Sequence, residues 1–196
     1  MSGKEIGMPA PSLSKAAGVQ AVFDDHERRI CQLAKSAYAV VGCVAWVTNQ
    51  RILTAFAESP CGVSIVLHHD EHASRTDKIG LDTEAVPPMS VDCDGPEVAC
   101  ELPYVTMRPF EDNGRPAMLH AKFLVFCDVA VGRLVPSVVW VGSANLTNNA
   151  TRNIEAGVII VDPVTARAFA SAWRACLAFA VMGNGAVPDW TGVVAR

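Results

Sequence analysis

The chain has 196 residues, of which 51% are hydrophobic and 18% are charged, a balance that excludes a disordered protein. The length favours one domain with a substantial core. The formal net charge is −4, so the overall field does not attract polyanions, which argues against a non-specific nucleic-acid coat protein. Seven cysteines, an odd number without a C-x-x-C pair, favour thiols in a reducing compartment over a disulfide framework.

The first third of the chain predicts a β-α-β unit that follows a flexible arm at residues 1–22. The arm lacks the apolar stretch of a signal peptide and no later run has the length of a membrane span, so we expect a cytoplasmic protein. An apolar stripe predicts a helix at residues 24–39, and continuous apolar runs predict buried strands at 40–48 and 63–69. Between the strands, Asn49 can cap a short helix. This order predicts two neighbouring parallel strands.

The remaining elements complete an α/β domain at residues 23–182, with an irregular tail at 183–196. Strands at 118–126 and 138–143 predict an antiparallel hairpin with an enlarged loop. A further strand is expected at residues 155–161. The last helix has one apolar face, which is formed by Phe169, Ala172, Trp173, Cys176, Leu177 and Ala180.

Polar residues interrupt the two strands of this hairpin in a pattern that suits phosphate chemistry. His120 and Lys122 are two positions apart, so in a strand they share a face, and burying them is costly unless they find partners. Ser143 and Asn145 follow the returning strand. Two neutral donors and one cation can hold phosphate oxygens while an imidazole attacks phosphorus. Glu155 could accept the far ring N–H of His120 and fix its tautomer.

The order of these residues resembles a known signature. His120-x-Lys122, followed by "GSANLT" and "NIEAGV", is similar to the H-x-K-x4-D-x6-G-S-x-N pattern of the phospholipase D superfamily, and the similarity covers roughly residues 24–180. The resemblance implies a mixed β-sheet flanked by helices on both faces. It also implies a two-step phosphodiester transfer in which one histidine forms a phosphohistidine and a second protonates the leaving oxygen. Lys122 and Asn145 would stabilise the phosphoryl oxygens, with no metal or cofactor.

The sequence departs from the signature after Lys122. The position of the family's aspartate holds Cys127, and Asp128 comes one residue later. A one-residue offset in a strand turns a side chain to the opposite face unless a bulge intervenes. Because that aspartate is mainly structural in the family, we expect the chemistry to survive, with Asp128 as the candidate structural carboxylate.

The chemistry needs two histidines, and the chain supplies one motif. No other histidine has a lysine two residues later, and no second "GS-x-N" exists. We therefore expect a twofold homodimer in which each subunit contributes His120, Lys122 and Asn145 to one shared site. The histidine-rich run at residues 68–72 lacks a second ligand cluster, so we interpret it as a polar loop and expect no metal site.

The most specific prediction is a nuclease that cleaves DNA or RNA, because short single-motif chains resemble the nuclease branch of the superfamily. A phospholipid-directed enzyme is the alternative, and it would need an exposed apolar rim or an amphipathic helix at the site. Because the predicted amphipathic helices have faces that a core would use, we expect no stable membrane association. A catalytically impaired module that binds phosphate or nucleic acid also stays open, since Cys127 and the long loop depart from the family pattern.

Overall fold

The computed structural model describes residues 18–68, 90–93, 104–107, 110–112 and 115–182, which form a mixed seven-stranded sheet in the order β1-β9-β8-β7-β2-β3-β4. A separate two-stranded sheet pairs β5 with β6. The strands are β1 (Gly18–Val22), β2 (Ala39–Val44), β3 (Val63–His68), β4 (Tyr104–Met107), β5 (Phe110–Asp112), β6 (Arg115–Ala117), β7 (Lys122–Ala130), β8 (Arg133–Gly142) and β9 (Gly157–Val161). The predicted parallel pair is β2 with β3, and this prediction is confirmed.

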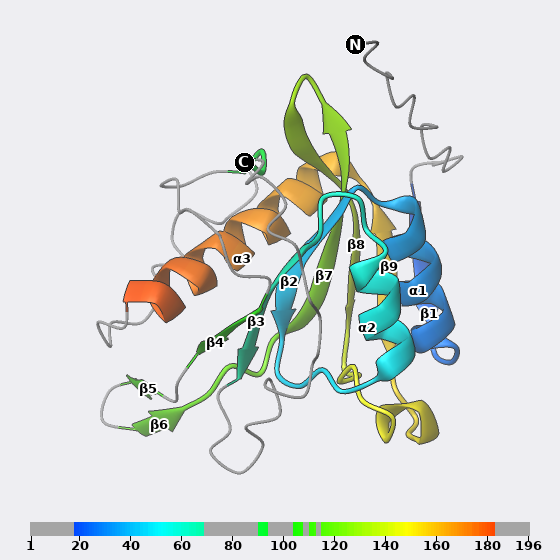
Figure 1. Ribbon diagram of the computed structural model, residues 1–196. Coiled ribbons are helices and arrows are strands. Elements are labelled where there is room, and N and C mark those ends of the chain that lie inside the picture. The colour runs from blue at the N-terminus through cyan, green and yellow to red at the C-terminus, as the bar shows by residue number, and fades with distance from the viewer. Residues whose placement is uncertain (1–17, 69–89, 94–103, 108–109, 113–114, 183–196) are drawn as a thin grey trace, which may run out of the picture.

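Helices cover both faces of the large sheet (Figure 1). The helices are α1 (His26–Ser36), α2 (Gln50–Ala57), the short 3-10 helix η2 (Ala150–Arg152) and α3 (Pro163–Met182). One core lies between the sheet and the α1–α2 pair, and a second lies between the sheet and α3. The predicted α/β fold, a mixed sheet flanked by helices on both faces, is therefore confirmed. No helix in the described part of the chain is long and apolar enough to span a membrane.

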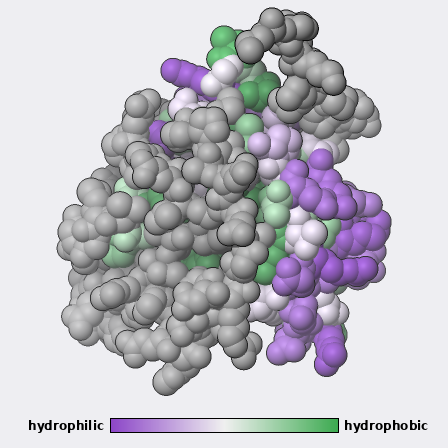
Figure 2. All heavy atoms as spheres, viewed as in Figure 1, coloured by the Kyte–Doolittle hydropathy of each residue, from purple (hydrophilic) through white to green (hydrophobic). Residues whose placement is uncertain are grey.

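Strand β7 explains why the sequence carries continuous apolar runs rather than an alternation of apolar and polar residues. Leu124 and Phe126 pack in the core beneath α1 and α2, whereas Phe123, Val125 and Cys127 pack in the core beneath α3. A strand that is covered on both faces must be apolar at successive positions. The outer surface of α1 and α2 is hydrophilic instead, as Figure 2 shows on the right of the molecule.

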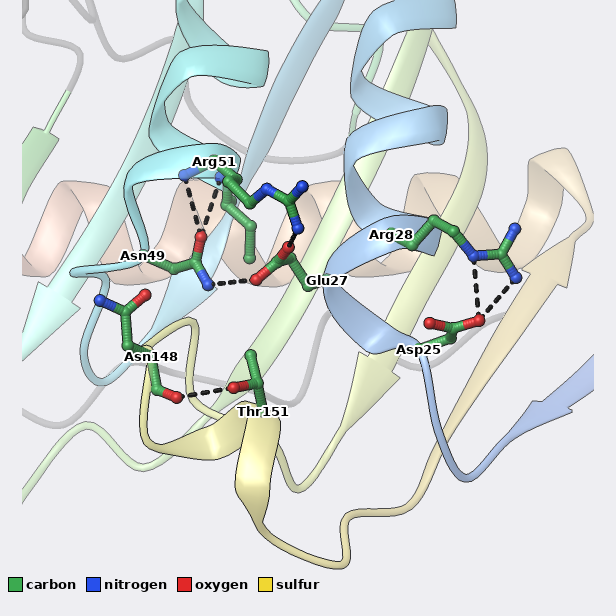
Figure 3. Close-up of polar contacts among 8 residues, drawn as sticks. Asp25, Glu27, Arg28, Asn49, Arg51, Asn148 and Thr151 are labelled. Atoms are coloured by element: carbon green, nitrogen blue, oxygen red, sulfur yellow. Dashed lines mark hydrogen bonds and ion pairs between the residues drawn. The ribbon is translucent and has the colours of Figure 1, made fainter.

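Asn49 joins the starts of α1 and α2 (Figure 3). Its side-chain oxygen accepts hydrogen bonds from the backbone N–H groups of Arg51 (3.0 Å) and Ile52 (3.2 Å), which confirms the predicted cap. Its amide nitrogen donates to Glu27 at 2.7 Å, and Glu27 also forms an ion pair with Arg51 at 2.8 Å. The buried Asn49 side chain therefore satisfies backbone N–H groups at the start of α2 and holds this helix against α1.

The Asn49→Ala substitution is expected to lower the free energy of unfolding by about 2 kcal/mol, because it removes a helix cap and leaves buried donors without a partner. Asn49 is only 1% exposed. The matched control is Asn148→Ala, since Asn148 is exposed and only its backbone oxygen is used, by the Thr151 hydroxyl (Figure 3). We expect that control to change stability by less than about 0.5 kcal/mol. Urea unfolding measures both, and equal losses would contradict the capping account.

The hairpin differs from its prediction. Strand β7 runs on to Ala130 and β8 begins at Arg133, so a two-residue turn, not an enlarged loop, connects them. Val131 and Gly132 in the turn both have positive φ, as the tight turns of hairpins require. Pro136 obscured the strand in the sequence, and it is tolerated because the strand register shifts there. The prediction of an enlarged loop is therefore wrong.

The N-terminal boundary also needs correction. Residues 18–22 form β1, which pairs antiparallel with β9 at the edge of the sheet, so the prediction of a flexible arm is wrong for these five residues. The mixed composition of "GVQAV" carries no strong strand signal, and its pairing partner lies about 140 residues later in the chain. Residues 1–17, most of the excursion at 70–96 and the predicted tail at 183–196 lie outside the described residues.

Candidate active site

Most of the predicted site residues converge at one end of the large sheet. Strand β7 begins there at Lys122, opposite the end of β2. Strand β8 ends there at Gly142, which pairs with the first residue of β9, Gly157. The segment that connects β8 to β9 therefore brings Ser143, Asn145 and Glu155 to the end of the sheet where β7 starts.

His120 lies just outside the sheet. Residues 118–121, between β6 and β7, are not in a strand, so the prediction that His120 and Lys122 share a strand face is wrong. The two are joined differently, because Lys122 Nζ donates a hydrogen bond to the backbone oxygen of His120 at 3.0 Å. The His120 side chain is exposed and makes no hydrogen bond to any other residue that the structure describes. Its imidazole can therefore be reached from solvent.

The Lys122 side chain is buried, with 7% of its surface exposed. Burial lowers its pKa, and the negative charge of Glu155 opposes that effect. A partly desolvated ammonium group is weakly hydrated and interacts more strongly with an incoming anion than an exposed lysine does.

Glu155 is held by the segment around it. The Ser143 hydroxyl donates to one carboxylate oxygen, and the Asn153 amide donates to the other at 3.2 Å. The Ser143 hydroxyl oxygen also accepts the backbone N–H of Ala156 at 3.0 Å. The hydrogen bond from Ser143 is the main reason that the pKa of Glu155 is lowered, so the group is a carboxylate at neutral pH.

The predicted hydrogen bond from His120 to Glu155 does not occur within the described part of a single chain, where Ser143 and Asn153 take the carboxylate instead. The sequence predicted that Glu155 would lie near the other candidate residues, but it could not show which donor reaches the carboxylate. The role of Glu155 in fixing the tautomer of His120 stays a prediction.

The Ser143→Ala substitution is expected to raise the pKa of Glu155 toward its ordinary value, because it removes the hydrogen bond that stabilises the carboxylate most. A carboxyl group with a lowered folded-state pKa stabilises the fold above its ordinary pKa, and this contribution disappears as the pH falls through the folded-state value. The variant therefore loses part of that acid-sensitive stability. Carboxyl carbon NMR titration measures the shift, with Thr151→Ala as control. An unchanged Glu155 titration in Ser143→Ala would refute the assignment.

Two glycines allow close packing at this end of the sheet. A Cβ atom on Gly142 would lie 2.7 Å from the backbone oxygen of Ala156. A Cβ atom on Gly157 would lie 3.0 Å from the ring of His26. Both substitutions would force backbone or ring to move, so the glycine in "GSAN" and the glycine in "EAG" let β8, β9 and an imidazole approach one another.

His26, the first residue of α1, was missed by the sequence interpretation. Its Nδ1 accepts a hydrogen bond from Trp140 Nε1 at 3.3 Å, and the two rings meet edge to face. The two residues are 114 positions apart in the chain, so no local sequence pattern predicts this contact. Trp46 and His68 form a similar edge-to-face pair at the ends of β2 and β3, where Trp46 is half-buried rather than part of the core.

A groove of about 860 Å³ runs between α1, α2 and the segment that follows β8. His26 and Asn145 line it, together with apolar side chains that include Ile30, Ile52 and Leu146. Arginines on its rim are paired with acidic residues, as in the ion pair of Arg28 with Asp25 at 2.7 Å (Figure 3). The groove therefore combines an apolar lining with a rim whose arginines are ion-paired within the chain.

The remaining predicted residues lie away from this end. Asp128 is six residues along β7 from Lys122, and Cys127 is fully buried against α3. The register shift beside Cys127 inserts its extra residue, Ser137, in β8, so no bulge turns Asp128 within β7. A structural role for Asp128 stays a prediction. Among the described residues no group of histidine, cysteine, aspartate or glutamate side chains has the arrangement of a metal site, and residues 69–72 lie outside them.

Solved structures share this fold. The chain is similar to NucT from Helicobacter pylori (TM-score 0.58, 16% identity, 83% of this chain and 97% of that one). It is also similar to Nuc from Salmonella typhimurium, described as a phospholipase D family member (TM-score 0.55, 18% identity, 83% of this chain and 95% of that one). These likenesses show a common fold.

Sequence comparison gives the family. An uncharacterized protein, L381 of Acanthamoeba polyphaga mimivirus, is 22% identical over 172 residues, which cover 74% of this chain and 60% of that protein. The chain thus spans about 60% of the length of this curated relative. The sequence profile of the family described as "Cardiolipin synthase, PLD-like domain" matches residues 30–176, most of the described domain. The chain therefore belongs to this PLD-like family, within the phospholipase D superfamily.

Proposed function

We propose that the protein is a metal-independent phosphodiesterase that cleaves nucleic acid through a phosphohistidine on His120, at a site shared by two subunits. The observation that carries the proposal is the pairing of a buried ammonium with an exposed imidazole. Lys122 is fixed at the end of β7 and bonded to the main chain of His120, whose side chain is open to solvent. This arrangement suits anion binding next to a nucleophile.

The proposed reaction has two balanced displacements. In the first, a ring nitrogen of His120 forms a bond to phosphorus while the bond from phosphorus to the leaving oxygen breaks, and the partner subunit's His120 gives that oxygen a proton. In the second, water attacks phosphorus, its proton passes to the partner subunit's His120, and the nitrogen–phosphorus bond breaks. Lys122 and the amide of Asn145 stabilise the phosphoryl oxygens in both steps, and Ser143 binds the phosphate when its hydroxyl turns from Glu155 to a phosphoryl oxygen.

A second copy of the chain is part of the proposal because two histidines must face one phosphorus atom. Exposed apolar side chains flank the site: Ile154 is fully exposed beside Glu155, and Met118 is 42% exposed two residues before His120. Exposed apolar residues around a site of this kind suit the contact between two subunits related by a twofold axis.

Phospholipid is the second candidate substrate, since the apolar surface that this reading requires is present. Phe23 is 69% exposed at the groove that Asn145 also lines, and Met118 and Ile154 flank the site as well. We favour nucleic acid because the chain shares its fold with NucT and Nuc, whose names suggest nucleases, over nearly the whole length of both proteins. If an acyl chain were found bound in the groove, phospholipid would be the better candidate substrate.

The deciding experiment offers the wild-type protein four substrates in EDTA: single-stranded DNA, double-stranded DNA, RNA and phosphatidylcholine vesicles. We expect products from at least one nucleic acid. Choline release alone would replace the proposal with the lipid reading. Salt-sensitive retention of DNA with no product at any pH would identify a binding module instead.

A further inference from the structure

Two buried polar atoms at the candidate site lack hydrogen-bond partners among the residues that the structure describes. They are Nε2 of His26 and the side-chain oxygen Oδ1 of Asn145. Both residues line the same groove. Because an unsatisfied buried polar group is costly, the two atoms call for an explanation.

The tautomer of His26 follows from its contact with Trp140. An indole N–H can only donate, so Nδ1 of His26 must be the acceptor in their 3.3 Å hydrogen bond. The proton of the uncharged ring is then on Nε2. The two atoms are therefore complementary, since one is a donor and the other is an acceptor.

The surroundings of His26 keep the ring in place. It lies over Gly157, where an added Cβ would approach the ring to 3.0 Å, and it meets the ring of Trp140 at a right angle, with 5.8 Å between the centroids. Trp140 is fully buried, so it cannot easily give way. A ring held by a buried donor on one side can direct its other nitrogen with little conformational freedom.

We propose that His26 is a positioning residue whose Nε2–H bonds Asn145 Oδ1 when phosphate occupies the site, and so directs the amide N–H groups of Asn145 toward the phosphate. This inference rests on the proposed function, since it assigns to Asn145 the role of phosphate ligand. Without a partner at Oδ1, an asparagine amide can turn over and present its oxygen to the phosphate, which would repel it.

The first test needs no substrate. Nitrogen-15 NMR of histidine-labelled protein shows which ring nitrogen of His26 carries the proton, and the proposal requires Nε2–H. The Asn145 side-chain amide signals should shift when inorganic phosphate is added to the wild-type protein, and that shift should be lost in His26→Phe. A proton on Nδ1, or an unchanged phosphate response in His26→Phe, would overturn the proposal even if the protein cleaves no phosphodiester.

The second test is a double-mutant cycle on the cleavage rate. His26→Phe keeps an aromatic ring but removes both ring nitrogens, and we expect kcat to fall about 10- to 100-fold with KM little changed. In an Asn145→Ala background the same substitution should cause no further loss, since its effect passes through that amide. His26→Gln, which can place an N–H near the position of Nε2, should recover part of the rate.

Additive losses in the cycle would show that His26 does not act through Asn145. A loss as large as that of His120→Ala, with no recovery in His26→Gln, would make His26 a catalytic residue and overturn the positioning role. Thermal unfolding of each variant shows whether the substitution damages the fold. If it does, the NMR measurement of which His26 ring nitrogen carries the proton in the wild-type protein decides whether the proposal stands.

Discussion

His120→Ala is expected to reduce phosphodiester cleavage by about 10⁴-fold or more, because it removes the nucleophile on which both steps of the proposed reaction depend. The His120 side chain is exposed and precedes β7, so the free energy of unfolding should change by less than about 0.5 kcal/mol. Initial rates with the best substrate in EDTA and urea unfolding of the same preparation measure the two effects.

The covalent intermediate gives this variant a second readout. Acid-free denaturation of the wild-type protein during turnover of a phosphorus-labelled substrate should leave label on the chain, and His120→Ala should retain none. Phosphate on a histidine nitrogen is labile in acid, which distinguishes it from a serine ester. Full cleavage by His120→Ala, or label retained by it, would remove His120 from the reaction.

Lys122→Met should separate catalysis from stability. We expect kcat/KM to fall by about 10²- to 10³-fold, since the variant loses one cation aimed at the phosphoryl oxygens. The free energy of unfolding should stay the same or rise, because methionine fills a similar volume without burying a charge. Lys35→Met is the matched control: Lys35 is exposed and pairs with Glu58 at 3.3 Å on the surface, so neither activity nor stability should change much.

The pH dependence of the free energy of unfolding tests whether the burial of the Lys122 charge is what makes Lys122→Met as stable as the wild-type protein. Burial lowers the folded-state pKa of Lys122, so between this value and the ordinary lysine pKa the unfolded chain binds more protons than the folded one. The contribution of Lys122 to the free energy of unfolding therefore rises with pH across that window, and it should be absent in Lys122→Met. A large loss of stability in Lys122→Met at neutral pH would show that the ammonium is better satisfied than we infer.

Features that depend on local pattern were predicted well. The continuous apolar runs identified β2 and β3 as strands covered on both faces, and Asn49 identified the start of α2. The spacing of apolar residues in α3 gave the face that packs on the sheet, where Trp173, Cys176 and Leu177 are buried. These features lie within about one element of the chain, where a single periodicity determines what is buried.

The errors share a different cause, which is pairing between distant segments. Edge strand β1 exists only because β9 offers it hydrogen bonds, and His26 reaches the site only because that pairing leads the chain over Gly157. His120 seemed part of a strand because apolar residues surround it, yet the described pairing of β7 with β2 begins at Lys122. The order of the motif residues predicted that most of them would meet at one end of the sheet, but tertiary contacts decide which side chains touch there.

Sedimentation velocity of the active protein, with cleavage followed across the boundary as it moves, decides whether two subunits share one site. We predict that all phosphodiesterase activity travels with a dimer, because each subunit supplies one of the two histidines that act on a single phosphorus atom. Cleavage that travels with a monomer would contradict it.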